Sequence, residues 1–248
     1  MKYKYHLESH QGLRNENQDN AAIFKNKYGY AVAVLADGMG GHIGGKLASS
    51  MAIRVMEVLF MELDLTNMTD ENIIIWSKAA VDTIKKEMIL YSNEHPEVSD
   101  MGTTLVFVIF GKSKIYITNI GDSRAYKIEN KTATQLTVDQ NYVNSIEDPE
   151  EKARISLTVV GEYLTSSLGP NKEMKVESFF IPIDIKDHIV LTCDGIHKFI
   201  PEQKFTKLLV STQSSEQLVK KLISTAKKNK STDNMTAISI QSEVGGGA

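Results

Sequence analysis

Four aspartates in this sequence share one local setting, in which a run of apolar residues gives way to a turn. Asp37, Asp122, Asp194 and Asp233 stand in the segments Leu-Ala-Asp-Gly, Ile-Gly-Asp-Ser, Thr-Cys-Asp-Gly and Thr-Asp-Asn-Met. The ends of strands are rigid and their loops are exposed, so carboxylates placed there can converge on one point. Converging like charges require a cation, and oxygen ligands without a His-rich or Cys-rich pattern favour Mg²⁺ or Mn²⁺ over Zn²⁺.

Turn formation is the simpler explanation of any one of these aspartates, because aspartate and glycine are both preferred turn residues. The shared setting at four positions favours a metal site without settling it. Cys193, next to Asp194, raises a different chemistry, that of a thiol nucleophile. The sequence lacks the glycine-rich anion loop and following arginine that a cysteine-dependent phosphatase requires, so we interpret Cys193 as structural.

Hydrophobic periodicity predicts the elements that must position these aspartates. Strands of β-favouring residues are expected at residues 3–9, 21–24, 30–36, 103–110, 114–120, 123–128, 133–136, 175–182, 189–193 and 235–241. Helices are expected at residues 48–59, 73–88, 201–210 and 214–228, with capping side chains at Thr69 and in a capping box of Ser214 and Gln217. Tight Gly-Lys-Ser and Glu-Asn-Lys turns suit hairpins, so the four strands between residues 103 and 136 are expected to form one meander.

The strands cluster in blocks separated by helix pairs, a pattern that indicates an α+β fold of layered, mostly antiparallel sheets. We expect a single domain over residues 1–242, in which residues 139–170 form a mobile flap with a charged, partly helical segment at 146–154. The glycines at residues 245–247 indicate a flexible tail over residues 243–248.

Composition argues against two classes of partner. A formal net charge of -3 provides no basic field for a nucleic-acid backbone. The longest uninterrupted apolar stretch, residues 105–110, is far shorter than the roughly 20 residues of a membrane helix.

The single Cys193 cannot form an intramolecular disulfide, and the first residues lack the apolar core of a signal peptide. We therefore expect a cytoplasmic protein with no membrane span.

Six short segments follow one another along almost the whole chain, at residues 14–20, 37–42, 102–104, 121–126, 194–195 and 233–236. In order and spacing they resemble the motifs of the type 2C metal-dependent protein phosphatases, and the Asp-Gly-Met-Gly-Gly form is similar to bacterial members. The resemblance implies a four-layer α-β-β-α sandwich, in which two antiparallel sheets pack face to face between helix pairs. The metals would lie between strand ends at one edge.

The resemblance also implies roles for the aspartates. Asp37 would bridge two metal ions, the backbone carbonyl of Gly38 would bind the second ion, and Asp194 and Asp233 would complete the first. Asp122, together with Asp194, would serve a third ion of weaker affinity. The ions implied are Mg²⁺ or Mn²⁺.

Three further residues have a role under the same resemblance. Arg14 would bind the phosphate through its planar fork of donors, although a surface salt bridge is the alternative for this arginine. Asp19 would hold metal-bound waters from outside the ligand shell. The leaving alkoxide needs a proton, and His42 or a metal-bound water could donate it.

Several positions depart from the family pattern. Met39 stands where many eukaryotic relatives carry a histidine, Lys46 where glutamate is common, and Gln140 where histidine is common. His197 and Lys198 replace the usual polar pair after the aspartate-glycine turn. These changes keep the metal-binding positions but put substrate contacts in doubt.

The resemblance implies a serine/threonine protein phosphatase that hydrolyses phosphoserine and phosphothreonine by direct attack of a metal-bound water, with two ions or three. The expected partners are phosphorylated proteins, among them a serine/threonine kinase and its targets, and the expected state is a monomer. Two alternatives stay open: a phosphomonoesterase for small molecules on the same fold, and a catalytically weak module that binds phosphoproteins. Retention of every metal-binding aspartate favours an enzyme over the binding module.

Overall fold

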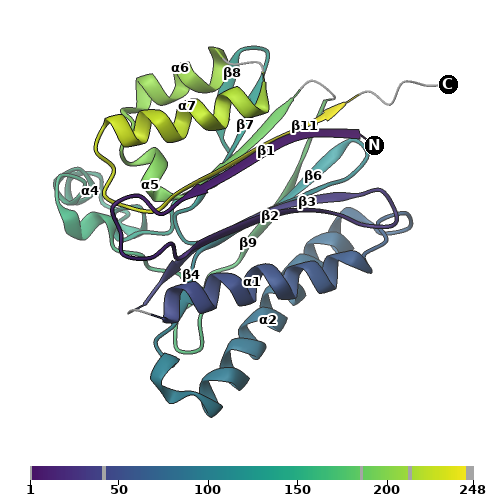
Figure 1. Ribbon diagram of the computed structural model, residues 1–248, viewed down its shortest axis with the longest axis horizontal. Coiled ribbons are helices and arrows are strands. Elements are labelled where there is room, and N and C mark those ends of the chain that lie inside the picture. Colours follow the sequence, from purple (N-terminus) through teal and green to yellow (C-terminus); the bar gives the residue numbers. More distant parts are fainter. Residues whose placement is uncertain (1, 41–42, 185–186, 212–213, 244–248) are drawn as a thin grey trace.

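The computed structural model describes residues 2–40, 43–184, 187–211 and 214–243, and its centre is a pair of antiparallel sheets (Figure 1). The first sheet consists of β1 (Lys2–His10), β11 (Met235–Glu243), β10 (His188–Thr192), β7 (Arg124–Glu129) and β8 (Thr132–Gln135), in that spatial order. The second consists of β2 (Asp19–Lys25), β3 (Ala31–Met39), β5 (Leu105–Phe110), β6 (Lys114–Ile120) and β9 (Glu177–Pro182), with the short β4 (Gly102–Thr103) paired to β3.

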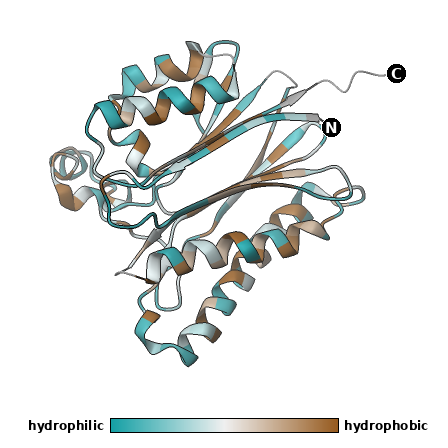
Figure 2. Cartoon of the chain, in the orientation of Figure 1, coloured by the Kyte–Doolittle hydropathy of each residue, from teal (hydrophilic) through white to brown (hydrophobic). Residues whose placement is uncertain are grey.

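Helices cover the outer face of each sheet, so the chain forms four layers (Figure 1). α1 (Gly44–Met61) and α2 (Asp70–Glu94) lie against the second sheet, and α6 (Glu202–Ser211) and α7 (Ser215–Lys228) lie against the first. Figure 2 shows hydrophilic and hydrophobic residues mixed along these helices, as expected of helices with one buried face. The α+β sandwich expected from the sequence is confirmed. In the described part of the chain, none of the helices has the length and apolar character needed to cross a bilayer.

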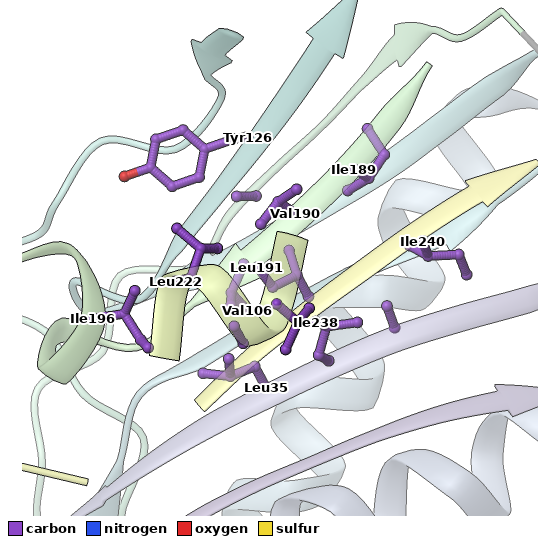
Figure 3. Close-up of a cluster of buried hydrophobic side chains, with 14 of the residues drawn as sticks. Leu35, Val106, Tyr126, Ile189, Val190, Leu191, Ile196, Leu222, Ile238 and Ile240 are labelled. Atoms are coloured by element: carbon purple, nitrogen blue, oxygen red, sulfur yellow. The ribbon is translucent and has the colours of Figure 1, made fainter. Parts of the chain in front are cut away.

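Strand β3 is buried on both faces. Its odd-numbered residues from 31 to 35 belong to the apolar cluster shared with the first sheet, and its even-numbered residues from 32 to 36 belong to the cluster shared with α1 and α2. Figure 3 shows Leu35 and Val106 of the second sheet close to Leu191 and Ile238 of the first. Alternating side chains therefore fix β3 from two sides and give it a rigid end.

A long connection between β8 and β9 holds α3 (Tyr142–Ser145), α4 (Pro149–Ile155) and the 3₁₀ helix η2 (Val159–Glu162). Backbone hydrogen bonds close its base, from the amide of Tyr142 to the carbonyl of Tyr163 at 2.8 Å and from Thr165 to Gln140 at 2.9 Å. The partly helical segment expected at residues 146–154 is found as α4. The mobility of this flap stays a prediction. Two other short helices, η1 (Pro96–Val98) and α5 (Asp194–His197), were not expected.

The predicted four-strand meander is wrong. β5 and β6 form a hairpin in the second sheet, whereas β7 and β8 form a hairpin in the first. The chain changes sheets after β6 at Gly121, whose φ of 96° lies in the left-handed region and whose Cβ, if present, would lie 2.7 Å from the Thr104 side chain. Apolar alternation looks the same in either sheet, so the periodicity could not reveal this crossover.

Predictions at element ends had mixed outcomes. Thr69 caps α2, since its side chain accepts a hydrogen bond from the amide of Asn72 at 3.2 Å. Ser214 precedes α7, but its side chain makes no capping hydrogen bond, so the predicted capping box with Gln217 is wrong. β11 extends to Glu243, one residue into the predicted tail, and residues 244–248 lie outside the described chain.

Candidate metal centre

Strand ends from both sheets surround a cavity of about 860 Å³. Asp37 and Gly38 lie near the end of β3, Asp122 follows β6, Asp194 follows β10, and Asp233 precedes β11. All of these residues line the cavity, as does Arg14 from the loop between β1 and β2. The structure thus brings together residues that are far apart along the chain and that the sequence analysis assigned to one site.

The position of Asp37 is fixed by the Gly-Thr-Thr segment at residues 102–104. The amide of Asp37 donates to Oγ1 of Thr104 at 3.1 Å, and the carbonyl of Asp37 accepts from Oγ1 of Thr103 at 2.9 Å and from the amide of Thr104 at 2.8 Å. At Gly38 a Cβ would lie 2.2 Å from the carbonyl oxygen of Gly45, so only glycine fits this close approach to α1.

Asp19 lies opposite Asp37 in the β2–β3 ladder. It is buried, and its Oδ2 accepts a hydrogen bond of 2.6 Å from Oγ1 of Thr236, whereas Oδ1 has no hydrogen-bond partner among the described residues. Burial raises the pKa of Asp19 to about 6. The potential ligand atoms of Asp19, Asp37 and Cys193 all lie within 4.8 Å of one another.

The carboxylates of the cavity oppose one another's ionisation. Although Asp37 borders the cavity, its withdrawal from water raises its pKa well above the usual value, and repulsion from Asp19 and the other aspartates raises it further. Burial also raises the pKa of Asp122, against the lowering effect of Lys198. A divalent cation relieves such repulsion and can satisfy the unbonded oxygen of Asp19 through its hydration shell, so this donor set fits Mg²⁺ or Mn²⁺.

Arg14 forms a two-pronged salt bridge with Asp233. Its Nε and Nη2 atoms donate to Oδ1 and Oδ2 of Asp233, each at 2.8 Å, and its side chain is 58% exposed. The alternative considered for Arg14, a salt bridge, is therefore present, but its partner is a candidate metal ligand. The guanidinium is held beside the cavity in the orientation that also suits two oxygens of a phosphate.

Asn234 fixes the loop that carries Arg14, a role that the sequence analysis missed. Its Nδ2 donates to the carbonyls of Gln11 at 2.7 Å and Glu16 at 2.9 Å, and its Oδ1 accepts from the amide of Gln18 at 2.9 Å. The signal available in the sequence was its place directly after Asp233 in a quoted motif. A motif residue with an amide side chain can form hydrogen bonds with backbone groups instead of contacting the substrate.

Lys198 reaches into the cavity, although the sequence analysis noted it only as a departure from the family pattern. Its Nζ lies 2.9 Å from Oδ2 of Asp122, 3.1 Å from Oδ2 of Asp194 and 3.3 Å from Oε2 of Glu162. Burial lowers the pKa of Lys198, but attraction to Asp122 and Asp194 outweighs burial, and the pKa lies above its usual value. The four-residue spacing from Asp194 on a helical turn was the available signal.

Neither histidine near the motifs is placed as a proton donor. His42 lies outside the described residues. His197 is buried, its Nδ1 lies 3.0 Å from Oγ1 of Thr192, and burial lowers its pKa well below the usual value, so the ring stays neutral. Burial also raises the pKa of the Cys193 thiol well above the usual value, and Sγ accepts a hydrogen bond from the amide of Thr236 at 3.1 Å. These contacts agree with a structural Cys193.

Comparison with known proteins matches residues 8–238 to the family model described as protein phosphatase 2C. The serine/threonine phosphatase stp of Listeria welshimeri is 31% identical over 237 residues, which cover 92% of this chain and 91% of that protein. The crystal structure of the serine/threonine phosphatase Stp1 from Staphylococcus aureus is 27% identical, with a TM-score of 0.86 over 98% of this chain and 96% of that one.

A third comparison concerns the catalytic domain of the serine threonine protein phosphatase PstP, solved in complex with two manganese ions. It shares the fold, with a TM-score of 0.79 at 24% identity over 96% of this chain and 97% of that one. The family match spans nearly all of the described strands and helices, and all six motif segments lie within the matched residues. The chain belongs to the protein phosphatase 2C family and is a phosphoprotein phosphatase of that type.

Proposed function

We propose that this phosphatase removes phosphate from phosphoserine and phosphothreonine in proteins, with two Mg²⁺ or Mn²⁺ ions held by Asp37, Gly38, Asp194 and Asp233. The observation that carries the proposal is the convergence of these oxygen donors and Arg14 on one cavity. Relatives named as serine/threonine phosphatases and the two manganese ions of the PstP structure support it.

The contribution of this chain is to position charge. Divalent ions bound by carboxylates supply a nucleophilic water at neutral pH and neutralise the oxygens of a transferring phosphoryl group. Asp37 stands near the rigid end of β3, and three hydrogen bonds hold its backbone amide and carbonyl, so its carboxylate has little freedom to move. The unbonded Oδ1 of Asp19 can accept hydrogen bonds from the ions' hydration shell.

Arg14 would bind the phosphate of the substrate. Two parallel N–H donors match two phosphoryl oxygens as well as they match the carboxylate of Asp233. A cation bound to Asp233 competes for the negative charge that now holds Arg14. An ion held by Asp233 would therefore free the Arg14 guanidinium to bind a phosphate.

Part of the cavity wall belongs to the flap, through Glu162, Tyr163 and Leu164. The Tyr163 side chain is 61% exposed and can contact the residues that flank a phosphorylated side chain. Among the described residues that line the cavity, none is a histidine. His42 stays our proposed proton donor from this chain, with water as the alternative source.

Hydrolysis of a phosphothreonine peptide with and without Mn²⁺ tests this proposal. The unaltered chain should release phosphate only with the metal, and Asp37→Asn and Asp233→Asn should each lose about 100-fold or more, as expected for a lost ligand or its neighbour. Asp64→Asn is the matched control, because Asp64 bonds only to nearby Thr66 on the surface and should leave the rate unchanged.

Two outcomes would redirect the proposal. A folded, Mn²⁺-loaded chain that releases no phosphate from the peptide or from an aryl phosphate contradicts the enzyme and favours the phosphoprotein-binding module. A large preference for small phosphate esters over the peptide favours the phosphomonoesterase.

We also propose that the chain is a cytoplasmic monomer that acts on a serine/threonine kinase and that kinase's targets. The net charge of -3 speaks against nucleic acid as a partner. The buried, unpaired thiol of Cys193 is compatible with a reducing compartment.

A further inference from the structure

We infer that the ammonium group of Lys198 takes the place of the third metal ion implied between Asp122 and Asp194. The chain then works with two exchangeable ions and one built-in positive charge. The inference rests on the proposed two-ion site and reverses the expectation that Asp122 and Asp194 hold an ion of their own.

The ammonium lies between the two carboxylates. Nζ is 2.9 Å from Asp122 and 3.1 Å from Asp194, and a third carboxylate, Glu162, lies at 3.3 Å. An ammonium has three hydrogens to donate, one for each of these acids. The structure records no other hydrogen-bond partner for the Asp122 side chain within its described residues. Lys198 thereby satisfies a carboxylate whose side chain is only 5% exposed.

A metal ion cannot share this position with the lysine. Mg²⁺ demands six ligands in near-octahedral geometry at about 2.0 to 2.1 Å, whereas Nζ already fills the space between these two oxygens. An ion there would also stand next to the like charge of the ammonium group, and the two would repel each other. Of the proposed two-ion ligands, Lys198 contacts Asp194 through Oδ2 alone, and among the described residues it makes no hydrogen bond to Asp37 or Asp233, so oxygens for the two ions stay available.

The covalent attachment of this charge distinguishes it from an ion. Lys198 is fixed to the backbone one turn after Asp194, at the end of α5, so its charge does not depend on the metal concentration. Through Glu162 it also ties η2 of the flap to the strand ends of both sheets. Without Lys198 the carboxylates of Asp122 and Asp194 would repel each other. The same ammonium group also positions the flap beside the proposed ions.

Manganese uptake measured by equilibrium dialysis and Mn²⁺ electron paramagnetic resonance tests the inference without any need for turnover. The unaltered chain should bind two Mn²⁺ ions per chain. Lys198→Met, which keeps the apolar stem, and Lys198→Asp, which adds a carboxylate, should each bind a third and weaker ion. Lys46→Met is the control, since Lys46 pairs with Glu16 and not with Asp122 or Asp194, so its loss should leave the count at two.

The position of the added ion is checked by combining Lys198→Asp with Asp122→Asn, which should remove the third ion alone. Three ions on the unaltered chain, or two on both Lys198 variants when circular dichroism shows them folded, would overturn the inference. If the counts are as expected but no substrate is hydrolysed, the inference stands while the proposed function fails. If no variant takes up any ion, both fail.

Discussion

Asp19 shows how one buried carboxyl group connects ion binding with stability. Its pKa of about 6 in the folded chain exceeds the ordinary value of 3.8, so the folded chain holds this proton more tightly than the unfolded chain. The stability gained from that proton is complete below pH of about 4 and is lost as the pH rises through about 6. The metal-free protein is therefore penalised at neutral pH, where the proposed ions would relieve the penalty.

Asp19→Asn should stabilise the metal-free protein at pH 7.5 by about 1 to 3 kcal/mol, because the substituted amide carries no charge to bury. At pH 3 the two proteins should differ little, since Asp19 is then mostly protonated in both the folded and the unfolded chain. Urea unfolding in the presence of a chelator measures both values. A variant that is less stable than the unaltered chain at pH 7.5 would contradict this account. The same variant should bind Mn²⁺ roughly 10- to 100-fold more weakly.

Asn234→Ala should impair phosphate binding without touching a proposed ligand. Loss of its three hydrogen bonds to Gln11, Glu16 and Gln18 removes what holds this partly buried loop, so the free energy of unfolding should fall by about 1 to 3 kcal/mol and KM for the peptide should rise. Asn229→Ala is the control, because among the described residues that side chain bonds the carbonyl of Phe199 and no other group. The control should leave KM unchanged even if it lowers stability, and an equal KM increase in both variants would contradict the role.

The sequence predicted the aspartates and Arg14 because each has a local signature, either a strand end or a motif. It missed Asn234 and Lys198 because their roles depend on which distant loops meet. The role of Lys198 depends on its ion pairs with Asp122 and Glu162, which are distant in the sequence. His42 stays a prediction, since it lies outside the described residues.

At the scale of elements, backbone hydrogen bonds hold the two ends of the flap, at Gln140 and Leu168, and the ion pair between Lys198 and Glu162 ties η2 to the strand ends. Removing that contact in Lys198→Met should let the flap open more often, so trypsin should cleave it several-fold faster at Lys152 and Arg154 of α4, since proteolysis follows the population of the open form. Mass spectrometry of timed digests identifies the sites. Glu162→Gln should give a similar increase and Lys46→Met none. Unchanged cleavage in both flap variants would show that the contact does not restrain it.

Elements with strong periodicity were predictable, and their assignment to sheets was not. The apolar alternation of β5, β6 and β7 predicted strands correctly but could not show that Gly121 carries the chain from one sheet to the other. α5 has only four residues, too few for a periodic pattern. The hairpin between β7 and β8 was predictable, because Asn130 and Lys131 adopt φ values of 48° and 64° in the turn that their sequence favours.

At the scale of the whole molecule, the packing between the two sheets holds the site together. Leu35 is fully buried in that interface, two residues before Asp37. Leu35→Ala should lower the free energy of unfolding by about 2 to 5 kcal/mol, as expected for a cavity in a packed core, whereas Val58→Ala on the exposed face of α1 should change it by less than about 0.5 kcal/mol. Chemical denaturation measures both, and equal effects would contradict this view of the core.

The salt bridge between Arg14 and Asp233 has a consequence for the order of events at the cavity. While Asp233 binds the guanidinium, the donors that we propose for the phosphate are already engaged. If Asp233 is an ion ligand as proposed, an ion bound there would weaken this salt bridge and free Arg14 for the phosphate. By thermodynamic reciprocity, phosphate must then tighten ion binding by the same factor as the ion tightens phosphate binding. Because of this salt bridge, the metal-free enzyme should bind phosphoproteins weakly.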